Sequence, residues 1–278
     1  MATVLDGKAL AERVRAEVKE EVAELGAIGL ATVLVGDDSA SQIYIRRKHE
    51  AAEDVGIRSV DVRLPEQTTQ EELIEQVAAL SADESINGML VQLPLPAHID
   101  EDAVILAVDP AKDVDCLHPL NAGLLYLGRQ TLAPATPVGI MELLAAYDVE
   151  LQGAKAVVVG RSNIVGKPVA LLLLQQHATV TICHSRTRDL AHETLDADVL
   201  VVATGRAALV TAEMVKSGAA VVDVGMNRTD AGLVGDVDAA AMDVAGYMTP
   251  VPGGVGPMTI ACLLRNTVLA TRLQRDAV

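Results

Sequence analysis

Phenylalanine and tryptophan are absent from the 278-residue chain, and only four tyrosines are present. The core must therefore be built from Ala, Val, Leu and Ile, the composition that parallel strands covered by helices prefer. The shortage of aromatic side chains disfavours nucleic-acid binding by base stacking. A formal net charge of −16 disfavours binding through a general basic field. We therefore expect no nucleic-acid partner.

Cysteine is also scarce, and Cys116, Cys183 and Cys262 lie far apart without a Cys-x-x-Cys pair. This usage favours a reducing compartment and excludes a disulfide framework. The six histidines show no metal-ligand spacing, so no metal site is expected. No apolar run approaches the roughly 20 residues of a membrane span, and residues 1–25 are typical of a charged amphipathic helix rather than a signal peptide. The sequence predicts a cytoplasmic protein without a membrane partner.

Alternating helical and strand patterns form two series along the chain. Repeated βα units of this kind predict parallel, doubly wound sheets with right-handed crossovers. Pro94 and Pro96 end the first sheet, because proline cannot donate to a strand ladder. The less regular stretch 97–135 then contains the domain boundary. We expect an α/β fold of two α/β domains with a cleft between them, the second domain a Rossmann-like doubly wound parallel sheet. The expected helices are 6–25, 39–54, 69–80, 137–147 and 257–273, and the expected strands are 30–35, 58–64, 86–91, 156–159, 178–183, 199–203, 220–224 and 245–247.

A strand, a turn of small residues and a leucine-rich helix follow one another across residues 157–175. This geometry directs backbone N–H groups and the positive end of a helix at one point, which suits a phosphate. The turn carries Gly160, Ser162 and Gly166 and so departs from Gly-x-Gly-x-x-Gly, which leaves an ordinary βα turn as the alternative. Ser185 and Arg186 follow the next strand, at the place where NAD-binding folds have an acidic residue that binds the ribose 2′-hydroxyl. A hydroxyl and an arginine at this place favour binding of the 2′-phosphate of NADP.

Ser41, Tyr44 and Lys48 share one face of an expected helix. A lysine beside a tyrosine acts as an acid or base when desolvation lowers its pKa, and a solvated helix face is the alternative. Gln92 stands at the carboxyl end of a strand, where α/β sheets bind ligands, and its alternative role is to close a turn.

Asp113 and Asp115 form a loop pair near the domain boundary. Asp115 is flanked by apolar residues and needs a partner, whereas Asp113 equally suits a cap or an ion pair. Residues 250–259 form a turn rich in glycine and proline, in which Pro257 suits the first position of the last helix. The glycines of this turn allow a ligand close to the backbone, or a hinge between domains.

These segments occur in the same order in one family. The chain resembles the bifunctional methylenetetrahydrofolate dehydrogenase/methenyltetrahydrofolate cyclohydrolases across almost its whole length. The failed glycine pattern of the turn is itself a feature of that family. The matching segments are 41–48, 91–96, 112–115, 134–137, 160–168 and 250–259.

The resemblance implies an enzyme of one-carbon folate metabolism and purine biosynthesis. It would oxidise 5,10-methylenetetrahydrofolate with NADP+ and hydrolyse the methenyl product to 10-formyltetrahydrofolate. The implied catalytic set is Lys48, which would handle protons, Tyr44 and Gln92, which would tune and position it, and Asp115, which would hold the pterin. The other implied residues are Gly254, Pro257 and Thr259 for substrate, and Gly160, Arg161, Ser162, Gly166, Ser185, Arg186, Thr204 and Gly205 for NADP.

The resemblance also implies a homodimer with a substrate domain at 1–118, an NADP-binding domain at 119–254, and a C-terminal helix at 255–278 that packs back on the substrate domain. Two departures bear on the expected activity. Cys116 stands where the family usually has glycine, and the 203–207 loop lacks a usual proline. A Cβ at position 116 could shift Asp115. One alternative is therefore a dehydrogenase with little cyclohydrolase activity. An alternative of a different class is a catalytically silent NADP-binding sensor.

Overall fold

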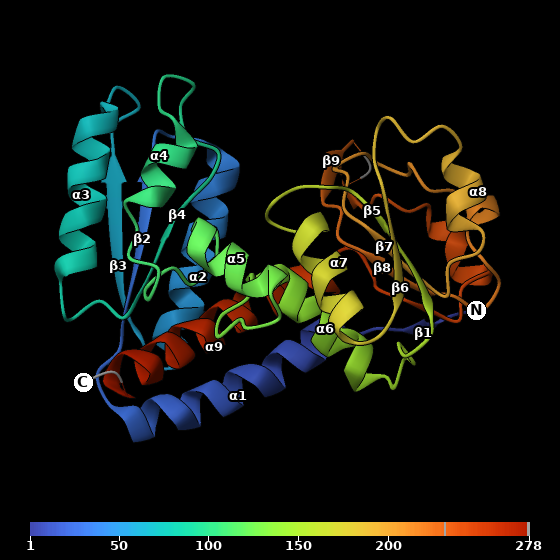
Figure 1. The fold of residues 1–278 in the computed structure, drawn as a ribbon, viewed down its shortest axis with the longest axis horizontal. Helices are drawn as coiled ribbons and strands as arrows, with labels where there is room; N and C mark the ends of the chain where they lie inside the picture. Colours follow the sequence, from blue (N-terminus) through green and yellow to red (C-terminus); the bar gives the residue numbers. More distant parts are fainter. Residues whose placement is uncertain (231, 277–278) are drawn as a thin grey trace. The chain divides into compact units, whose positions relative to one another are not determined.

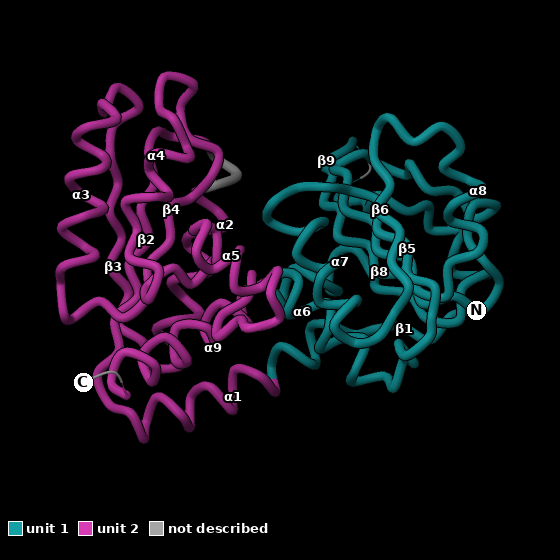
Figure 2. The backbone as a smooth tube through the Cα atoms, in the orientation of Figure 1, with its two compact units in different colours: residues 1–12, 136–259 teal, residues 13–135, 260–278 magenta. Residues whose placement is uncertain are grey.

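The structure, a computed structural model, describes residues 1–230 and 232–276, with the side chains of 39–41 left out. The chain forms two compact units, each made of segments distant in sequence (Figure 2). Unit 1 comprises residues 1–12 and 136–259, and unit 2 comprises residues 13–135 and 260–278. The chain passes between the units within helix α1 (Gly7–Leu25), at the start of α6 (Ala135–Ala146) and within α9 (Val255–Asp276). The two units are defined by contacts within the fold. The domain boundaries expected from the resemblance, at residues 118 and 254, instead separate segments of different expected function.

Unit 2 is built on a parallel three-stranded sheet in the order β3-β2-β4. Apolar side chains of β2 and β4 form a core with α3 and α4 on one face. Thr32 of β2 meets His49 of α2 on the other face, so helices cover both sides of the sheet (Figure 1). The strands are β2 (Gly29–Val35), β3 (Arg58–Leu64) and β4 (Gly88–Val91), and the helices are α2 (Ser39–Asp54), α3 (Gln70–Ala82), α4 (Glu101–Leu106) and α5 (Pro119–Tyr126).

Side-chain caps define where the helices of this chain begin. The Asp6 carboxylate accepts the Ala9 N–H at the start of α1, as the sequence predicted. Thr69 and Glu72 form a reciprocal capping box at α3. Asp100 caps α4, and the His118 ring accepts the Leu120 N–H at the start of α5, so the expected irregular stretch 97–135 contains two short helices.

Unit 1 is built on a parallel six-stranded sheet in the order β1-β11-β8-β7-β5-β6. An antiparallel hairpin, β9–β10, stands apart from this sheet. The expected Rossmann-like sheet is therefore present, with an additional first strand contributed by the start of the chain. The strands are β1 (Thr3–Val4), β5 (Lys155–Val159), β6 (Thr179–Cys183), β7 (Val199–Val202), β8 (Ala220–Asp223), β9 (Asn227–Thr229), β10 (Gly232–Val234) and β11 (Tyr247–Met248), and the remaining helices are α7 (Gly166–Gln175), α8 (Leu190–Thr194), η1 (Ala212–Met214) and η2 (Ala239–Asp243).

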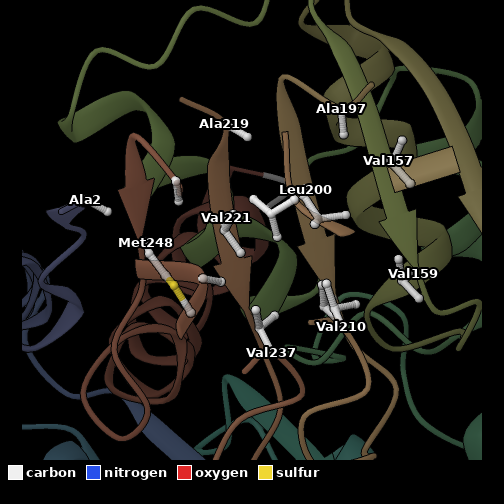
Figure 3. Packing of buried hydrophobic residues seen from close by; sticks show 14 of the residues in the cluster. Ala2, Val157, Val159, Ala197, Leu200, Val210, Ala219, Val221, Val237 and Met248 are labelled. Carbon is white, nitrogen blue, oxygen red and sulfur yellow. The ribbon is translucent and has the colours of Figure 1, made fainter. Parts of the chain in front are cut away.

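The core of unit 1 consists of small and branched aliphatic side chains, as the absence of Phe and Trp requires (Figure 3). Val157, Leu200 and Val221 of three neighbouring strands are completely buried in it. Burying a side chain of this size stabilises the fold by roughly 1.5–3 kcal/mol. The resulting rigid sheet fixes the positions of the loops at its carboxyl edge.

Candidate functional sites

The Lys48 side chain lies in unit 2 on α2 and is only 4 % exposed. Its Nζ lies 5.1 Å from the centroid of the Tyr44 ring, one helical turn earlier. The same Nζ donates to Oε1 of Gln92 at 3.4 Å. The solvated-face alternative is therefore wrong for Lys48. The side chain of Ser41, which shares this face in the sequence, lies outside the described residues.

Burial lowers the pKa of Lys48 below its ordinary value, and the nearby Asp115 carboxylate opposes that shift. A lowered pKa increases the fraction of neutral amine at any given pH. Lys48 can therefore accept a proton, which an exposed lysine does poorly. The half-buried Asp115 lies close enough to influence Lys48 electrostatically.

Gln92 follows β4 directly and is oriented at both ends of its amide. Its Nε2 donates to the Leu93 carbonyl at 2.8 Å, which leaves Oε1 directed at Lys48. The Gln92 amide thus bonds the backbone of the turn, the structural role considered for it, and at the same time contacts Lys48. The peptide bond that follows, Leu93–Pro94, is cis.

Asp113 fixes the loop that carries Asp115. Its carboxylate accepts the N–H groups of Leu117 and His118 at 3.2 and 2.8 Å and an Asn121 amide hydrogen at 3.0 Å. Burial raises the pKa of Asp113, and these hydrogen bonds partly oppose the shift. Asp113 is therefore a cap for the following segment, one of the two structural roles considered for it.

Cys116 adopts a left-handed backbone conformation with φ of 56° and is 4 % exposed. Its Sγ lies 3.6 Å from the Asp113 carbonyl oxygen. Burial, with the charges of Asp113 and Asp115, raises the pKa of the thiol well above its ordinary value, so the thiol stays neutral. A non-glycine residue is thus accommodated in a conformation that favours glycine.

A second polar contact beneath Lys48 was not anticipated from the sequence. Nε2 of His49 lies 2.5 Å from the hydroxyl of Thr32, which is completely buried in β2. Burial lowers the pKa of His49. The pair ties α2 to the sheet one residue after Lys48. Identifying this contact from the sequence would require knowing that α2 packs on β2, and sequence periodicity does not give that information.

In unit 1, the turn between β5 and α7 has two positions that only glycine fits. Gly160 has φ of 135°, and a Cβ there would lie 2.3 Å from the Ala203 carbonyl oxygen. A Cβ on Gly166 would lie 2.3 Å from the Gly160 carbonyl oxygen. The Ser162 hydroxyl accepts the N–H groups of Val165 and Gly166 at 3.2 and 3.3 Å, and thereby shapes the entry to α7. Glycine at these two positions therefore allows the chain to turn tightly from the end of β5 into the N-terminus of α7, the kind of helix end that binds phosphate groups.

The three segments expected to bind NADP follow three neighbouring strands, in the order β7-β5-β6. Gly160 donates its N–H to the Cys183 carbonyl at 2.9 Å, which places the turn beside the tip that carries Ser185 and Arg186. Thr204 and Gly205 follow β7 on the other side. Arg161, Ser185 and Arg186 are exposed. All of these residues lie at the carboxyl edge of the sheet, where dinucleotides bind in such folds.

The segment 250–259 also belongs to unit 1. Gly254 packs tightly, because a Cβ would lie 2.7 Å from the Thr249 Cβ, and its N–H donates to the Pro250 carbonyl at 2.8 Å. Thr259 shares a hydrogen bond of 2.9 Å with the Thr136 hydroxyl. Pro257 is the third residue of α9 rather than the first, because the helix begins at Val255. A proline fits there since the first turn of a helix needs no donor.

Among residues 1–230 and 232–276, no group of three or more His, Cys, Asp or Glu side chains could hold a metal ion, and no two cysteines form a disulfide. Within the same residues, no helix has the length and apolarity of a membrane span.

Two family models match the chain. Residues 5–115 match the catalytic domain of tetrahydrofolate dehydrogenase/cyclohydrolase, and residues 134–275 match its NAD(P)-binding domain. The bifunctional protein FolD of Halothermothrix orenii is 58 % identical over 98 % of this chain and 99 % of its own length. That of Moorella thermoacetica is 57 % identical, with 98 % and 99 % covered.

Solved structures agree with these matches. The bifunctional enzyme FolD (methylenetetrahydrofolate dehydrogenase/cyclohydrolase) of Campylobacter jejuni has a TM-score of 0.96 at 47 % identity, with 99 % of this chain and 100 % of that chain covered. The Trypanosoma brucei enzyme, solved with NADP cofactor and an inhibitor, has a TM-score of 0.94 at 41 % identity, with 99 % and 98 % covered. The chain therefore belongs to the tetrahydrofolate dehydrogenase/cyclohydrolase family.

Proposed function

We propose that the protein oxidises 5,10-methylenetetrahydrofolate to the methenyl compound with NADP+ and hydrolyses that product to 10-formyltetrahydrofolate. The observation that carries this proposal is the buried Lys48, held against Gln92 and Tyr44 and under the influence of Asp115. This set lies in the part of the chain that matches the family's catalytic domain. The glycine turn at 160–166 lies in the part that matches its NAD(P)-binding domain.

The oxidation step requires positioning more than acid–base help, because the folate nitrogens stabilise the cation that remains when a hydride leaves. NADP+, when bound, supplies the hydride acceptor. Gly160 and Gly166 allow the tight path of the turn beside it, since any Cβ at either position would collide with the chain's own backbone. Ser162 shapes the turn, and Ser185, Thr204 and Gly205 border it. We assign the 2′-phosphate to Arg161 and Arg186, which are exposed beside this turn.

The hydrolytic step requires a proton acceptor. Water adds to the methenyl carbon, and neutral Lys48 accepts the proton that the water loses. That proton then passes to the pterin ring nitrogen as its bond to the carbon breaks. The hydroxyl left on the carbon loses its remaining proton to solvent as the formyl C=O forms, and the formyl group stays on the other nitrogen. Gln92 orients the lysine through its Oε1, and the Tyr44 ring limits the access of bulk water. We assign Asp115 to the pterin, with Gly254, Pro257 and Thr259 as further substrate-binding residues.

The functional division proposed for the chain is a substrate domain at 1–118, an NADP-binding domain at 119–254 and a final helix at 255–278. We also propose a cytoplasmic homodimer that supplies one-carbon units to purine biosynthesis. The odd number of cysteines, scattered along the chain, supports a reducing compartment. The dimer rests on the family resemblance, and light scattering of the purified protein tests it.

The experiment that tests the proposed function is the substitution Lys48→Ala, assayed for its two reactions separately. We expect hydrolysis of supplied methenyltetrahydrofolate to fall by roughly 10²–10⁴-fold, the usual contribution of a positioned acid–base group. NADPH formation from the methylene substrate should largely survive. Lys19→Ala is the matched control, because Lys19 is exposed on α1. Unchanged hydrolysis in Lys48→Ala, or a wild type unable to reduce NADP+, would contradict the proposal.

A further inference from the structure

Asp236 is completely buried, yet it lies outside the residues expected to bind NADP. Its Oδ2 accepts three hydrogen bonds from the loop after β7: from the Thr204 N–H at 2.5 Å, the Thr204 hydroxyl at 3.0 Å and the Gly205 N–H at 2.9 Å. Its Oδ1 accepts an amide hydrogen of Asn227 at 2.9 Å. One carboxylate thus holds both residues that β7 contributes to the proposed cofactor site.

A second buried acid holds Asp236 in place. Oδ1 of Asp223, at the end of β8, accepts the N–H groups of Gly225 and Asp236 at 2.9 Å each. Its Oδ2 accepts the Val237 N–H at 2.9 Å, and the Asp223 N–H donates to the Thr249 hydroxyl at 2.8 Å. The carboxyl ends of β8 and β11 are therefore connected through Asp223 and Asp236 to the loop after β7.

The packing around these acids leaves little freedom for the loop to move. A Cβ on Gly235 would lie 1.7 Å from Oδ2 of Asp223, and one on Gly225 would lie 2.2 Å from Oδ1 of Asp236. The loop in turn contacts the glycine turn, since the Ala203 carbonyl oxygen lies where a Gly160 Cβ would be. A shift at Thr204 is thus transmitted to the segment proposed to bind the cofactor phosphates. Binding sites lose much of their efficiency when such a supporting group moves by about 1 Å.

We propose that Asp236 is a positioning residue for NADP+: it fixes the Thr204–Gly205 loop in its binding geometry without contacting the cofactor. The inference deepens the proposed function and rests on its assignment of Thr204 and Gly205 to the cofactor. It also predicts whether removing the Asp236 carboxylate weakens or tightens the binding of NADP+. NADP+ carries several negative phosphate charges, so by Coulomb's law alone the removal of a carboxylate nearby would tighten binding. The loss of a positioning group would weaken it.

The test is Asp236→Asn, compared with Asp238→Asn in the same loop. The asparagine keeps the side-chain shape but offers one oxygen in place of two, and its NH2 group faces donors. Asp238 accepts the Ala240 N–H at the start of η2, a cap that asparagine also provides, so this control should behave as wild type. The measurements are NADPH affinity by fluorescence titration, KM for NADP+, kcat, and hydrolysis of supplied methenyltetrahydrofolate.

We expect Asp236→Asn to weaken NADPH binding and raise KM for NADP+ by about tenfold, in line with the loss of one charge-assisted hydrogen bond. Hydrolysis, which uses no NADP+, should stay within about twofold of wild type. Asn227→Ala, which removes only the partner of Oδ1, should weaken NADPH binding by a smaller factor. This variant decides the matter if Asp236→Asn does not fold.

Unchanged or tightened NADPH binding would overturn the inference. So would an equal loss of both activities together with a lower Tm, because that pattern indicates a purely structural role. The proposed function fails separately, when the wild type itself neither binds NADPH nor reduces NADP+.

Discussion

The substitution Cys116→Gly tests how the chain tolerates a side chain where its family usually has glycine. Three terms decide its effect on stability. Relief of the left-handed conformation, with φ of 56°, contributes about 1–2 kcal/mol. Loss of the buried CH2–SH group costs about 1 kcal/mol. The greater freedom of glycine in the unfolded chain costs about 0.4–1 kcal/mol. The free energy of unfolding should therefore change by less than about 1 kcal/mol.

Two further variants separate these terms. Cys116→Ala keeps the left-handed conformation and loses the buried thiol, so calorimetry should show a Tm lower by about 2–4 °C. Cys116→Val places a branched side chain at positive φ and should destabilise by more than about 2 kcal/mol. The order of Tm should be Gly close to Cys, then Ala, then Val.

The activities of the same variants address the alternative of a dehydrogenase with little cyclohydrolase activity. The backbone at Cys116 already has a conformation that glycine favours, so the main chain of Asp115 need not move in Cys116→Gly. Hydrolysis of methenyltetrahydrofolate should then stay within about twofold of wild type, as should NADPH formation. A tenfold or greater gain in hydrolysis would refute this reasoning, because it would mean that the cysteine obstructs the site and that the natural enzyme is mainly a dehydrogenase.

Two other substitutions give further tests. Lys48→Met should stabilise the folded protein by about 1 kcal/mol near neutral pH and thereby raise Tm by about 2–4 °C. Because burial lowers the pKa of Lys48, the folded state binds fewer protons than the unfolded state between the lowered pKa and the ordinary one. The stabilisation by Lys48→Met should be largest below the lowered pKa and vanish as pH rises through the ordinary lysine pKa of 10.5. A stabilisation that grows with pH would contradict a lowered pKa in the folded state. Gly160→Ala should destabilise unit 1 and abolish NADPH formation, since its Cβ would meet the Ala203 carbonyl. Gly153→Ala is the control, because Gly153 has φ of 75° but nothing lies within 4 Å of its Cβ position. Its free energy of unfolding should fall by only about 1 kcal/mol. Equal destabilisation of the two alanine variants would show that the backbone conformation, rather than the contact with Ala203, decides the effect.

Much of the fold could be predicted from the sequence because its elements are long and clearly bounded. Helix α2 and strand β3 have the predicted limits, 39–54 and 58–64. The short elements were missed: β1 spans two residues, and the β9 and β10 strands span three each. Such segments contain too few residues for a periodic pattern. β1 exists because β11, distant in sequence, completes its hydrogen bonds, whereas β9 and β10 pair with each other.

The candidate site divides in the same way. The association of Lys48 with Gln92 was expected from the family resemblance alone, and the two side chains are hydrogen-bonded in the structure. Asp236 could not be connected with Thr204, which precedes it by 32 residues. In the sequence, the Gly-Asp-Val-Asp segment at 235–238 has the composition of an ordinary loop. What distinguishes this segment is its close packing: a Cβ on Gly235 would collide with Asp223, and a Cβ on Gly225 would collide with Asp236. This packing becomes apparent only in the structure.

The interleaved composition of the two units has a consequence for biosynthesis. Thr3 pairs with Tyr247 in the sheet of unit 1, and Glu17 forms an ion pair with Arg265 in unit 2. At roughly 5–20 residues per second, a ribosome would need about 12–50 s to deliver Tyr247 after Thr3. Both units must therefore wait for late segments of the chain, and the nascent protein holds unpaired strand edges for most of its synthesis. A gene divided at any single point between Glu17 and Tyr247 would encode two fragments, neither of which contains a complete unit.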